Sequence, residues 1–245
     1  MSGAERAPRP AVAPAEPFRI SVPFTTQASC LLVPPARPAP GPPPLLVALH
    51  GQGQDGERQR SWVGAGIPEH FAVAYPNGFH MLEVRATGKP IRIGHSWYLF
   101  TGDQEAFAQR LAESEEALWR LILAAQQALG SDPARLWLYG FSQGAYLAHC
   151  AAVRAAGRVK GWIAQSGRLK VEFLQRELPS VRGKPVLIQH GQKDPHLPDG
   201  AAESSAAALR EHGARVELRL YDSGHEITPA MVADVRAFLL AEEPA

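Results

Sequence analysis

Short runs of consecutive apolar residues recur along this chain, and segments with helical periodicity separate them. The runs lie at residues 45–49, 71–75, 136–139, 161–164 and 185–189. A run of four or five apolar residues without alternation is typical of a strand that is buried on both faces of a parallel sheet. Together with the helical segments, these runs predict an α/β fold with a mostly parallel, doubly wound sheet flanked by helices.

The segments between the runs carry helix start and stop signals. The longest helix is expected at residues 103–129, where apolar residues recur at helical spacing. Thr101 and Gln104 have the spacing of a capping box at its start, and Gly130 follows its end. Three further helices are expected after Ser142, at residues 199–212 and from Thr228 onward.

The first 44 residues differ from the rest because they are crowded with proline. Residues 1–17 are predicted to form a mobile segment rich in Pro and Ala that stays outside the core. Apolar residues at 18–24 and 29–33 predict two strands before the first buried run. A chain of 245 residues has the length of one α/β core, so residues 18–245 are predicted to be a single domain.

Composition and charge exclude several classes of protein. Hydrophobic residues make up 45% of the chain and charged residues 20%, which is the balance of a globular protein. The 25 Lys and Arg residues nearly match the 24 Asp and Glu residues, so no nucleic-acid partner is expected. No apolar stretch approaches the roughly 18 residues of a membrane span, and prolines stand where a signal peptide needs an apolar core. We therefore expect a cytoplasmic monomer or homodimer.

Cysteine and histidine spacing gives no indication of a metal site. Cys30 and Cys150 cannot form a disulfide framework, and both are expected to be buried apolar residues. Four histidines also lack ligand spacing and are expected to be surface or helix-packing residues: His70, His80, His149 and His212.

The strongest chemical signal is the sequence Gly-Phe-Ser-Gln-Gly at residues 140–144, which follows a predicted strand. A serine on a sharp turn from strand to helix needs strained backbone angles. The residues two before and two after it must then lack bulky side chains, and Gly140 and Gly144 meet this need. The motif predicts that Ser142 is a nucleophile. The alternative is a glycine-containing turn with an ordinary surface serine.

A serine hydroxyl is a poor nucleophile near neutral pH, so Ser142 would require a histidine base and a carboxylate that orients it. On this kind of turn the order along the chain is Ser, then Asp or Glu, then His, each on a loop after a later strand. Asp194 follows the apolar run at residues 185–189, and His225 follows a strand expected at residues 216–221. We predict that Asp194 is the acid and His225 the base.

Three other residues compete for these roles. Asp222 lies three residues before His225 and is an alternative acid, although it also fits a solvated turn. His190 and His196 are alternative bases, but they share the loop of Asp194 and would leave His225 without a role.

Acyl hydrolysis also needs hydrogen-bond donors for an oxyanion. The backbone N–H of Gln143 directly follows the nucleophile, and the backbone N–H of Gln52 lies on a glycine-containing loop after an early strand. Because main-chain groups would bind the oxyanion, the two glutamine side chains are expected to be dispensable. The alternative is that His50 and the glycines beside it only turn the chain.

Residues 79–100 show no clear periodicity, and a loop of this length favours a functional role. One interpretation is a flap over the serine, in which Trp97 and Tyr98 line an acyl pocket and nearby cations face an acidic leaving group. The other is a surface loop with a packed Trp97 and solvated cations. Both remain open.

Four segments in this order resemble the phospholipase/carboxylesterase family of α/β hydrolases, which includes acyl-protein thioesterases and small bacterial carboxylesterases. They are Leu-His-Gly-x-Gly at 49–53, the serine motif, Gly-x-x-Asp-Pro at 191–195 and Gly-His at 224–225. The resemblance spans roughly residues 45–240. It implies an α/β-hydrolase fold, a triad of Ser142, Asp194 and His225, and no metal or organic cofactor.

The chain departs from this family at two places. Members that accept long acyl chains commonly have an apolar residue where this chain has Gln52. Residues 79–100 are only loosely similar, although Trp97 keeps aromatic neighbours. Both departures concern the substrate rather than the chemistry.

The sequence therefore predicts a serine hydrolase that cleaves esters or thioesters of short to medium acyl chains through an acyl-enzyme on Ser142. The substrate would be a small molecule or an acylated protein. Two alternatives remain on the same fold: a ligand-binding, receptor-like module, and a serine peptidase or amidase.

Overall fold

The computed structural model describes residues 27–244. The segment predicted at residues 1–17 and the strand predicted at residues 18–24 lie outside the described residues, so the expected division at residue 18 stays a prediction. Within the described part, strands and helices extend from residue 30 to residue 242, and from residue 104 onward they alternate.

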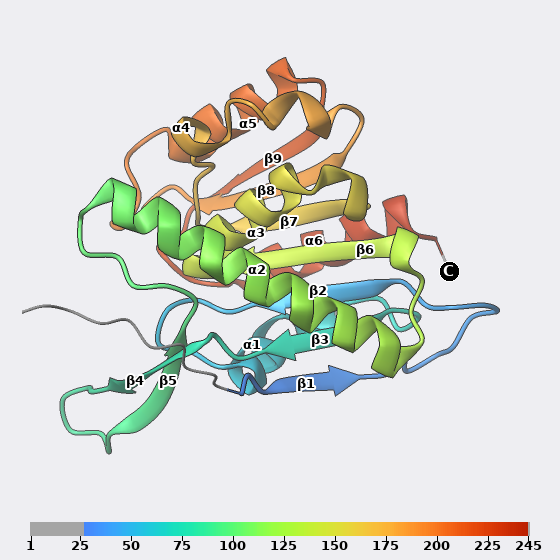
Figure 1. Cartoon of the computed structure of the whole chain (residues 1–245), viewed down its shortest axis with the longest axis horizontal. Helices are drawn as coiled ribbons and strands as arrows, with labels where there is room; N and C mark the ends of the chain where they lie inside the picture. The colour runs from blue at the N-terminus through green and yellow to red at the C-terminus, as the bar shows by residue number, and fades with distance from the viewer. Residues whose placement is uncertain (1–26, 245) are drawn as a thin grey trace, which may run out of the picture.

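One seven-stranded sheet forms the centre of the described structure (Figure 1). Its strands are β1 (Cys30–Val33), β2 (Leu45–Leu49), β3 (Ala72–Pro76), β6 (Leu136–Phe141), β7 (Gly161–Gln165), β8 (Pro185–Gly191) and β9 (Arg215–Tyr221). They lie in the order β1-β3-β2-β6-β7-β8-β9, with β1 antiparallel to β3 and every other neighbouring pair parallel. This is the predicted α/β-hydrolase sheet, and the strand ends lie within two residues of the expected positions.

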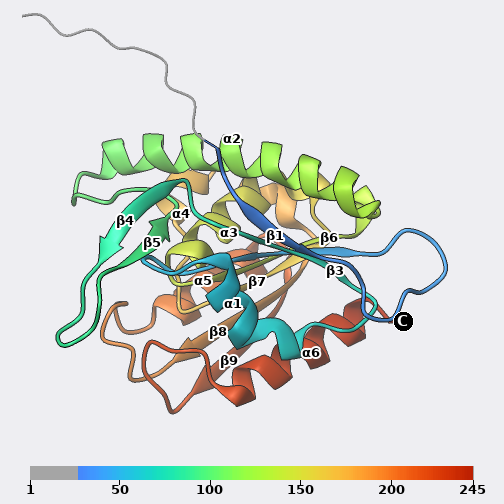
Figure 2. The ribbon, with the colours of Figure 1, turned by 90° about the horizontal axis from the view of Figure 1, so that it is seen from below.

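Six α-helices are present among the described residues. They are α1 (Gly56–Val63), α2 (Gln104–Leu129), α3 (Gln143–Arg154), α4 (Val171–Leu174), α5 (Ala201–Glu211) and α6 (Pro229–Glu242). Short 3₁₀ turns lie at Gly64–Gly66, Pro133–Arg135, Ala156–Arg158 and Leu178–Val181. Figure 2 shows α2 above the strands and α1 and α6 below them, so helices cover both faces of the sheet. The sequence pattern had not indicated α1 or α4.

The interior strand β2 shows how the sheet connects the two helix layers. Its alternate side chains point to opposite faces, as in any strand. Leu45, Val47 and Leu49 pack in one core with residues of α2, α3 and α5. Leu46 and Ala48 pack in a second core with residues of α1 and α6.

The start of α2 differs from the prediction. Asp103 is the N-cap, and its carboxylate accepts hydrogen bonds from the backbone N–H groups of Glu105 and Ala106 at 3.0 and 3.1 Å. Asp is a strong N-cap residue because its side-chain oxygen satisfies free N–H groups of the first turn. The expected capping box of Thr101 and Gln104 is therefore wrong. The helix ends as predicted at Gly130, whose φ of 59° suits glycine.

The segment at residues 79–100 is not the irregular loop that the sequence indicated. It contains an antiparallel hairpin of β4 (His80–Val84) and β5 (Arg92–Ser96), which projects from one end of the molecule (Figure 1). The hairpin is tied to the loop after β2, because the backbone N–H of Gly53 donates to the carbonyl of His95 at 2.8 Å and the N–H of His95 donates to Gln54 at 2.8 Å.

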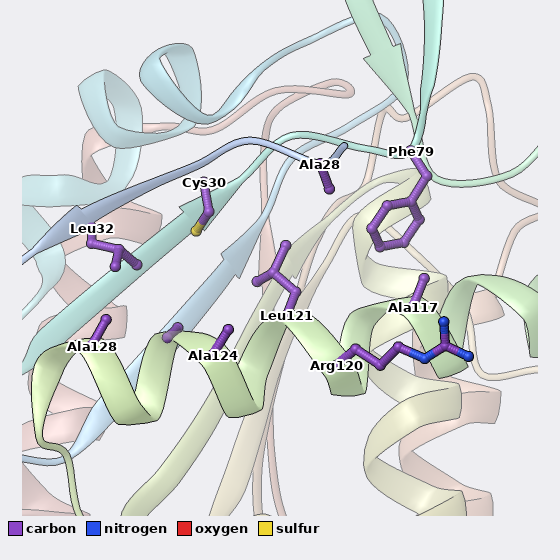
Figure 3. A pocket seen from close by; sticks show the side chains of 10 residues that line it. Ala28, Cys30, Leu32, Phe79, Ala117, Arg120, Leu121, Ala124 and Ala128 are labelled. Atoms are coloured by element: carbon purple, nitrogen blue, oxygen red, sulfur yellow. The ribbon is translucent and has the colours of Figure 1, made fainter. Parts of the chain in front are cut away.

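A groove with a cavity of about 660 Å³ lies between β1 and α2 (Figure 3). Its lining is mostly apolar: Ala28, Cys30, Leu32, Phe79, Ala117, Arg120, Leu121, Ala124, Ala125 and Ala128. Cys30 is only partly buried here and points toward α2, whereas Cys150 is fully buried in the core as expected. The groove contains none of the predicted catalytic residues.

Candidate active site

Ser142 lies on the turn between β6 and α3. Its φ of 53° and ψ of −118° are strained for a residue with a side chain. The two glycines of the motif allow this turn. A Cβ on Gly140 would lie 2.2 Å from the carbonyl oxygen of Gly144, and a Cβ on Gly144 would lie 2.5 Å from the carbonyl oxygen of Leu49. The steric reason predicted for the motif is therefore present in the structure.

The loops after β8 and β9 bring two further side chains to this serine. The Nε2 atom of His225 lies 2.8 Å from the Oγ atom of Ser142. The Nδ1 atom of the same ring lies 2.6 Å from the Oδ2 atom of Asp194. The Asp194 side chain is fully buried, and its other oxygen accepts a hydrogen bond from the backbone N–H of His196 at 2.8 Å. The carboxylate is thus held from both sides.

The competing residues lie elsewhere or have other contacts. Asp222 is exposed and forms an ion pair with Lys193 at 2.6 Å, so it does not contact the ring of His225. The Nδ1 atom of His190 lies 3.9 Å from the Oδ2 atom of Asp194, so this ring is near the acid and has no contact with Ser142. The ring of His196 packs edge to face on His225, with 4.7 Å between centroids.

The two expected oxyanion donors belong to residues at the cavity of Ser142. Gln52 and Gln143 both line the cavity that contains Ser142. Within residues 27–244, neither of their backbone N–H groups donates to a protein acceptor. Both are therefore free to donate to an oxygen on the substrate.

His50 has a definite part in shaping the loop that carries Gln52. The ring is fully buried, its Nδ1 atom lies 2.7 Å from the carbonyl oxygen of Gly51, and its Nε2 atom accepts a hydrogen bond from the N–H of Gly78 at 2.9 Å. This pattern requires the tautomer with hydrogen on Nδ1. Burial lowers the pKa of His50 to about 4, so the ring is neutral near pH 7.

The side chain of Gln143 is not the dispensable group that the sequence suggested. It is buried, its carbonyl oxygen accepts a hydrogen bond from the N–H of Trp97 at 2.9 Å, and its NH₂ group donates to the carbonyl of Tyr98 at 2.8 Å. The NH₂ group also donates a hydrogen bond to the hydroxyl of Ser96 at 2.9 Å. Gln143 therefore fixes the chain at residues 96–98 against the start of α3. Residue spacing gives no signal for this contact.

Trp97 and Tyr98 have different places. Trp97 is fully buried and does not line the cavity of Ser142. Its indole N–H donates to the carbonyl of His50 at 2.7 Å, so it supports the loop beneath the site. This corrects the expectation of Trp97 as an acyl-pocket residue. Tyr98 does line the cavity, and its hydroxyl donates to the carbonyl of Gln143 at 3.3 Å.

The cavity beside Ser142 has a volume of about 610 Å³. Its lining combines rings with polar and cationic groups: Gln52, Tyr98, Phe100, Gln104, Phe107, Ser142, Gln143, Tyr146, Arg168, Lys170, His196, Leu197 and His225. The sequence had not indicated Arg168 or Lys170. One feature of the sequence could have indicated them: both follow β7 closely, at the carboxyl end of the sheet, where ligands bind in folds of this class.

The described residues contain neither a metal-binding cluster nor a membrane-spanning helix. Between residues 27 and 244, no three His, Cys, Asp or Glu side chains lie together as a metal site would require. In the same part of the chain, no helix has the length and apolarity to cross a membrane.

Comparison with known proteins agrees with the resemblance noted in the sequence. A family model described as Phospholipase/Carboxylesterase matches residues 36–242, which is most of the chain. The chain belongs to this family.

Relatives of this phospholipase/carboxylesterase family member include two acyl-protein thioesterases. One from Eremothecium gossypii is 32% identical over 136 residues, covering 51% of this chain and 56% of the relative. One from Gibberella zeae is 31% identical over 120 residues, covering 47% and 51%. The chain thus spans about half the length of these curated relatives.

Solved structures show the same family fold over a larger share of the chain. The crystal structure of esterase PE8 is 26% identical, has a TM-score of 0.73 and covers 88% of this chain and 99% of its own. The carboxylesterase of Bacillus cereus has 20% identity and a TM-score of 0.68, with 88% of this chain and 94% of that structure covered, and it supports the fold.

Proposed function

We propose that this protein is a serine hydrolase that cleaves carboxylic esters or thioesters through an acyl-enzyme on Ser142. One observation carries the proposal: Ser142, His225 and Asp194 form a continuous chain of contacts, at 2.8 Å from serine to histidine and 2.6 Å from histidine to aspartate. A hydrogen-bonded series in this order is what activates a serine hydroxyl.

Each residue of the triad has a distinct step. The Nε2 atom of His225 takes the proton of Ser142 as the serine oxygen attacks the substrate carbonyl, and returns it to the departing alkoxide or thiolate. Water then attacks the acyl-enzyme by the same proton route and releases the carboxylic acid. Asp194 holds the Nδ1–H of His225 in place and stabilises the imidazolium that forms in each half-reaction.

The backbone N–H groups of Gln52 and Gln143 are the proposed donors to the tetrahedral oxyanion. Their free N–H groups beside Ser142 support this role. The contacts of His50 and of the Gln143 side chain hold the two donors before substrate arrives, so little reorganisation is needed as charge develops.

The lining of the cavity and the named relatives indicate the class of substrate. Esters or thioesters of short to medium acyl chains suit a cavity of about 610 Å³ with a polar, cationic lining. Two relatives are named acyl-protein thioesterases, so acylated proteins are included beside small molecules. We also propose that the protein is cytoplasmic and is a monomer or a homodimer.

A fluorophosphonate probe tests the activity directly, because it reacts with activated serines. We expect a single labelled site at Ser142, and loss of both labelling and ester turnover in the Ser142→Ala variant. A receptor-like module would show neither reaction. Turnover of amides at rates similar to those of matched esters would favour a peptidase or amidase, and ester turnover retained by Ser142→Ala would refute the proposal.

A further inference from the structure

Two cations line the cavity of Ser142, and no carboxylate does. Arg168 and Lys170 both contribute to the lining, whereas none of the described lining residues is Asp or Glu. The family resemblance assigns no role to either cation. An ester with an uncharged alkyl chain would offer neither cation a hydrogen-bond acceptor within the cavity.

A fixed loop places these cations. Ser166, directly after β7, has a φ of 51°, which is a strained value for serine. Gly167 then packs against the nucleophile turn, where a Cβ would lie 3.1 Å from the carbonyl oxygen of Ser142 and 2.5 Å from the Cβ of Ala145. The backbone N–H of Leu169 donates to Ser205 at 3.0 Å. The loop thus positions Arg168 and Lys170 relative to Ser142 before any ligand binds.

Lys170 is an unusual lysine because its side chain is only 5% exposed. Its ammonium nitrogen lies 5.2 Å from the ring centroid of Phe107 and 4.9 Å from that of Phe173. It also donates to the side-chain oxygen of Gln104 at 3.1 Å. Rings and an amide hold the ammonium group at the cavity, but neither neutralises its charge.

One carboxylate serves both cations. Glu172 accepts from Lys170 at 2.8 Å and from Arg168 at 2.9 Å. Burial opposes ionisation of Glu172, but the hydrogen bonds from the two cations outweigh it and lower its pKa to about 2. Asp194 is engaged with His225. The cluster of Arg168, Lys170 and Glu172 therefore carries one positive charge that no carboxylate in the cluster balances.

We propose that Arg168 and Lys170 bind an anionic group on the substrate, so that the preferred esters carry a carboxylate or phosphate on the acyl or alcohol part. This inference rests on the proposed ester hydrolysis. A partly desolvated Arg and Lys in fixed positions form strong, charge-assisted hydrogen bonds with such a group. An alkyl chain in the same place would remove water from the partly exposed Arg168 and offer neither cation a hydrogen-bond acceptor.

The test compares matched esters that differ by one carboxylate, by measuring kcat/KM in a pH-stat. The acyl arm pairs monoethyl glutarate with ethyl pentanoate, and the alcohol arm pairs 2-carboxyethyl butanoate with propyl butanoate. We expect the wild-type protein to prefer the anionic ester by about tenfold or more in one arm, which also locates the anion. Equal kcat/KM values in both arms would overturn the inference and leave ester hydrolysis standing.

Variants assign the preference to the two cations. Arg168→Gln and Lys170→Met should each reduce the ratio of anionic to neutral kcat/KM by about tenfold. Arg120→Gln is the matched control, because it removes one positive charge from an exposed ion pair with Glu116 on α2. Since Lys170 is buried and its variant is more prone to misfold, the partly exposed Arg168 provides the independent measurement.

Glu172→Gln should change the ratio of anionic to neutral kcat/KM in the opposite direction to the two cation variants. The variant removes the negative charge that competes for both cations, so the preference for the anionic ester should rise severalfold. An unchanged preference in Glu172→Gln, or one that survives in both cation variants, would mean that the cations serve the protein structure alone. Absence of turnover on all four esters, together with absence of fluorophosphonate labelling, would refute the proposed function and this inference with it.

Discussion

The side-chain oxygen of Gln143 accepts a hydrogen bond from the backbone N–H of Trp97 at 2.9 Å. The backbone N–H of the same glutamine is a proposed oxyanion donor. One residue thus joins the donor at the start of α3 to the segment that supports the cavity wall. Its side chain holds the cavity wall, and its main chain is positioned to bind the substrate oxygen at the same site.

Replacing Gln143 by Ala should therefore reduce both stability and activity. The change leaves the N–H of Trp97 without an acceptor, and a buried unsatisfied group costs about 1–3 kcal/mol. It also removes the hydrogen bond of the Gln143 NH₂ group to the carbonyl of Tyr98, which then keeps only the hydroxyl of Ser96 as a donor. We expect a lower free energy of unfolding in urea and a fall in kcat/KM of about tenfold or more on a short ester. The Gln52 side chain is exposed, so Gln52→Ala should change the free energy of unfolding by about 0.5 kcal/mol at most and kcat/KM by about twofold at most. Equal effects of the two substitutions would contradict this role of Gln143.

Two aspartates near His225 allow a matched test of the acid. Asp194→Asn keeps the side-chain shape but favours the wrong imidazole tautomer. We expect kcat to fall about 10³ to 10⁴-fold, as it does for the corresponding change in serine proteases, with little change in unfolding free energy. Asp222→Asn removes only an exposed partner of Lys193, so its loss should be severalfold at most. Activity on one activated ester measures both, and a greater loss in Asp222→Asn would show that the triad is wrongly assigned.

Acyl-chain length should be limited by the polar lining of the cavity. Gln52, Gln104 and Arg168 are all at least partly exposed, and a long alkyl chain would remove their hydration without supplying hydrogen bonds. We expect butanoyl esters to be turned over faster than hexadecanoyl esters, compared as kcat/KM with the same leaving group in detergent-free buffer. A preference for hexadecanoyl esters would contradict the prediction and indicate an apolar channel.

Local patterns were sufficient to predict the sheet and the order of the triad. The runs at β2, β6 and β8 are apolar without alternation because both faces of the sheet are covered. Asp194 and His225 follow strands directly, and the carboxyl ends of parallel strands share one edge of the sheet. The strand order alone was therefore enough to predict that Asp194 and His225 lie near Ser142.

The sequence pattern could not predict contacts between segments that are far apart along the chain. The hairpin of β4 and β5 lacks clean alternation because most of its side chains are exposed or only partly buried, so neither face has to be apolar throughout. Lys170 and Gln104 are 66 residues apart, and no periodicity relates them. Trp97 was placed in the acyl pocket because it is aromatic, yet its indole N–H has a partner beneath the site, at His50.

The buried His50 should make stability depend on pH. Burial lowers its pKa from 6.5 in the exposed state to about 4 in the folded protein. Between these values the unfolded chain binds a proton that the folded protein does not, so the free energy of unfolding falls as the pH is lowered from 6.5 to 4. Since each pKa unit corresponds to about 1.4 kcal/mol, this histidine contributes about 3 kcal/mol at most.

Other buried groups titrate over neighbouring ranges, so the test must compare variants. Burial also lowers the pKa of His149, to about 3, which adds to the loss of stability in acid. Burial raises the pKa of Glu115 to about 7, despite its contact with Arg154, and a raised carboxyl pKa has the opposite sign: stability falls as the pH rises from about 4.5 to 7. These contributions are common to the wild-type protein and a His50 variant, and they cancel in the difference.

The decisive measurement is urea unfolding at pH 7 and at pH 5 for the wild-type protein and His50→Asn. Asn does not titrate, and its amide is able to replace the donor to Gly51. The loss of unfolding free energy between the two pH values should be smaller in His50→Asn by about 2 kcal/mol. His80→Asn, on the exposed hairpin, should retain the full wild-type loss. An equal loss in His50→Asn and the wild-type protein would show that His50 does not stay neutral in the fold, and that the loop carrying Gln52 is held by other contacts.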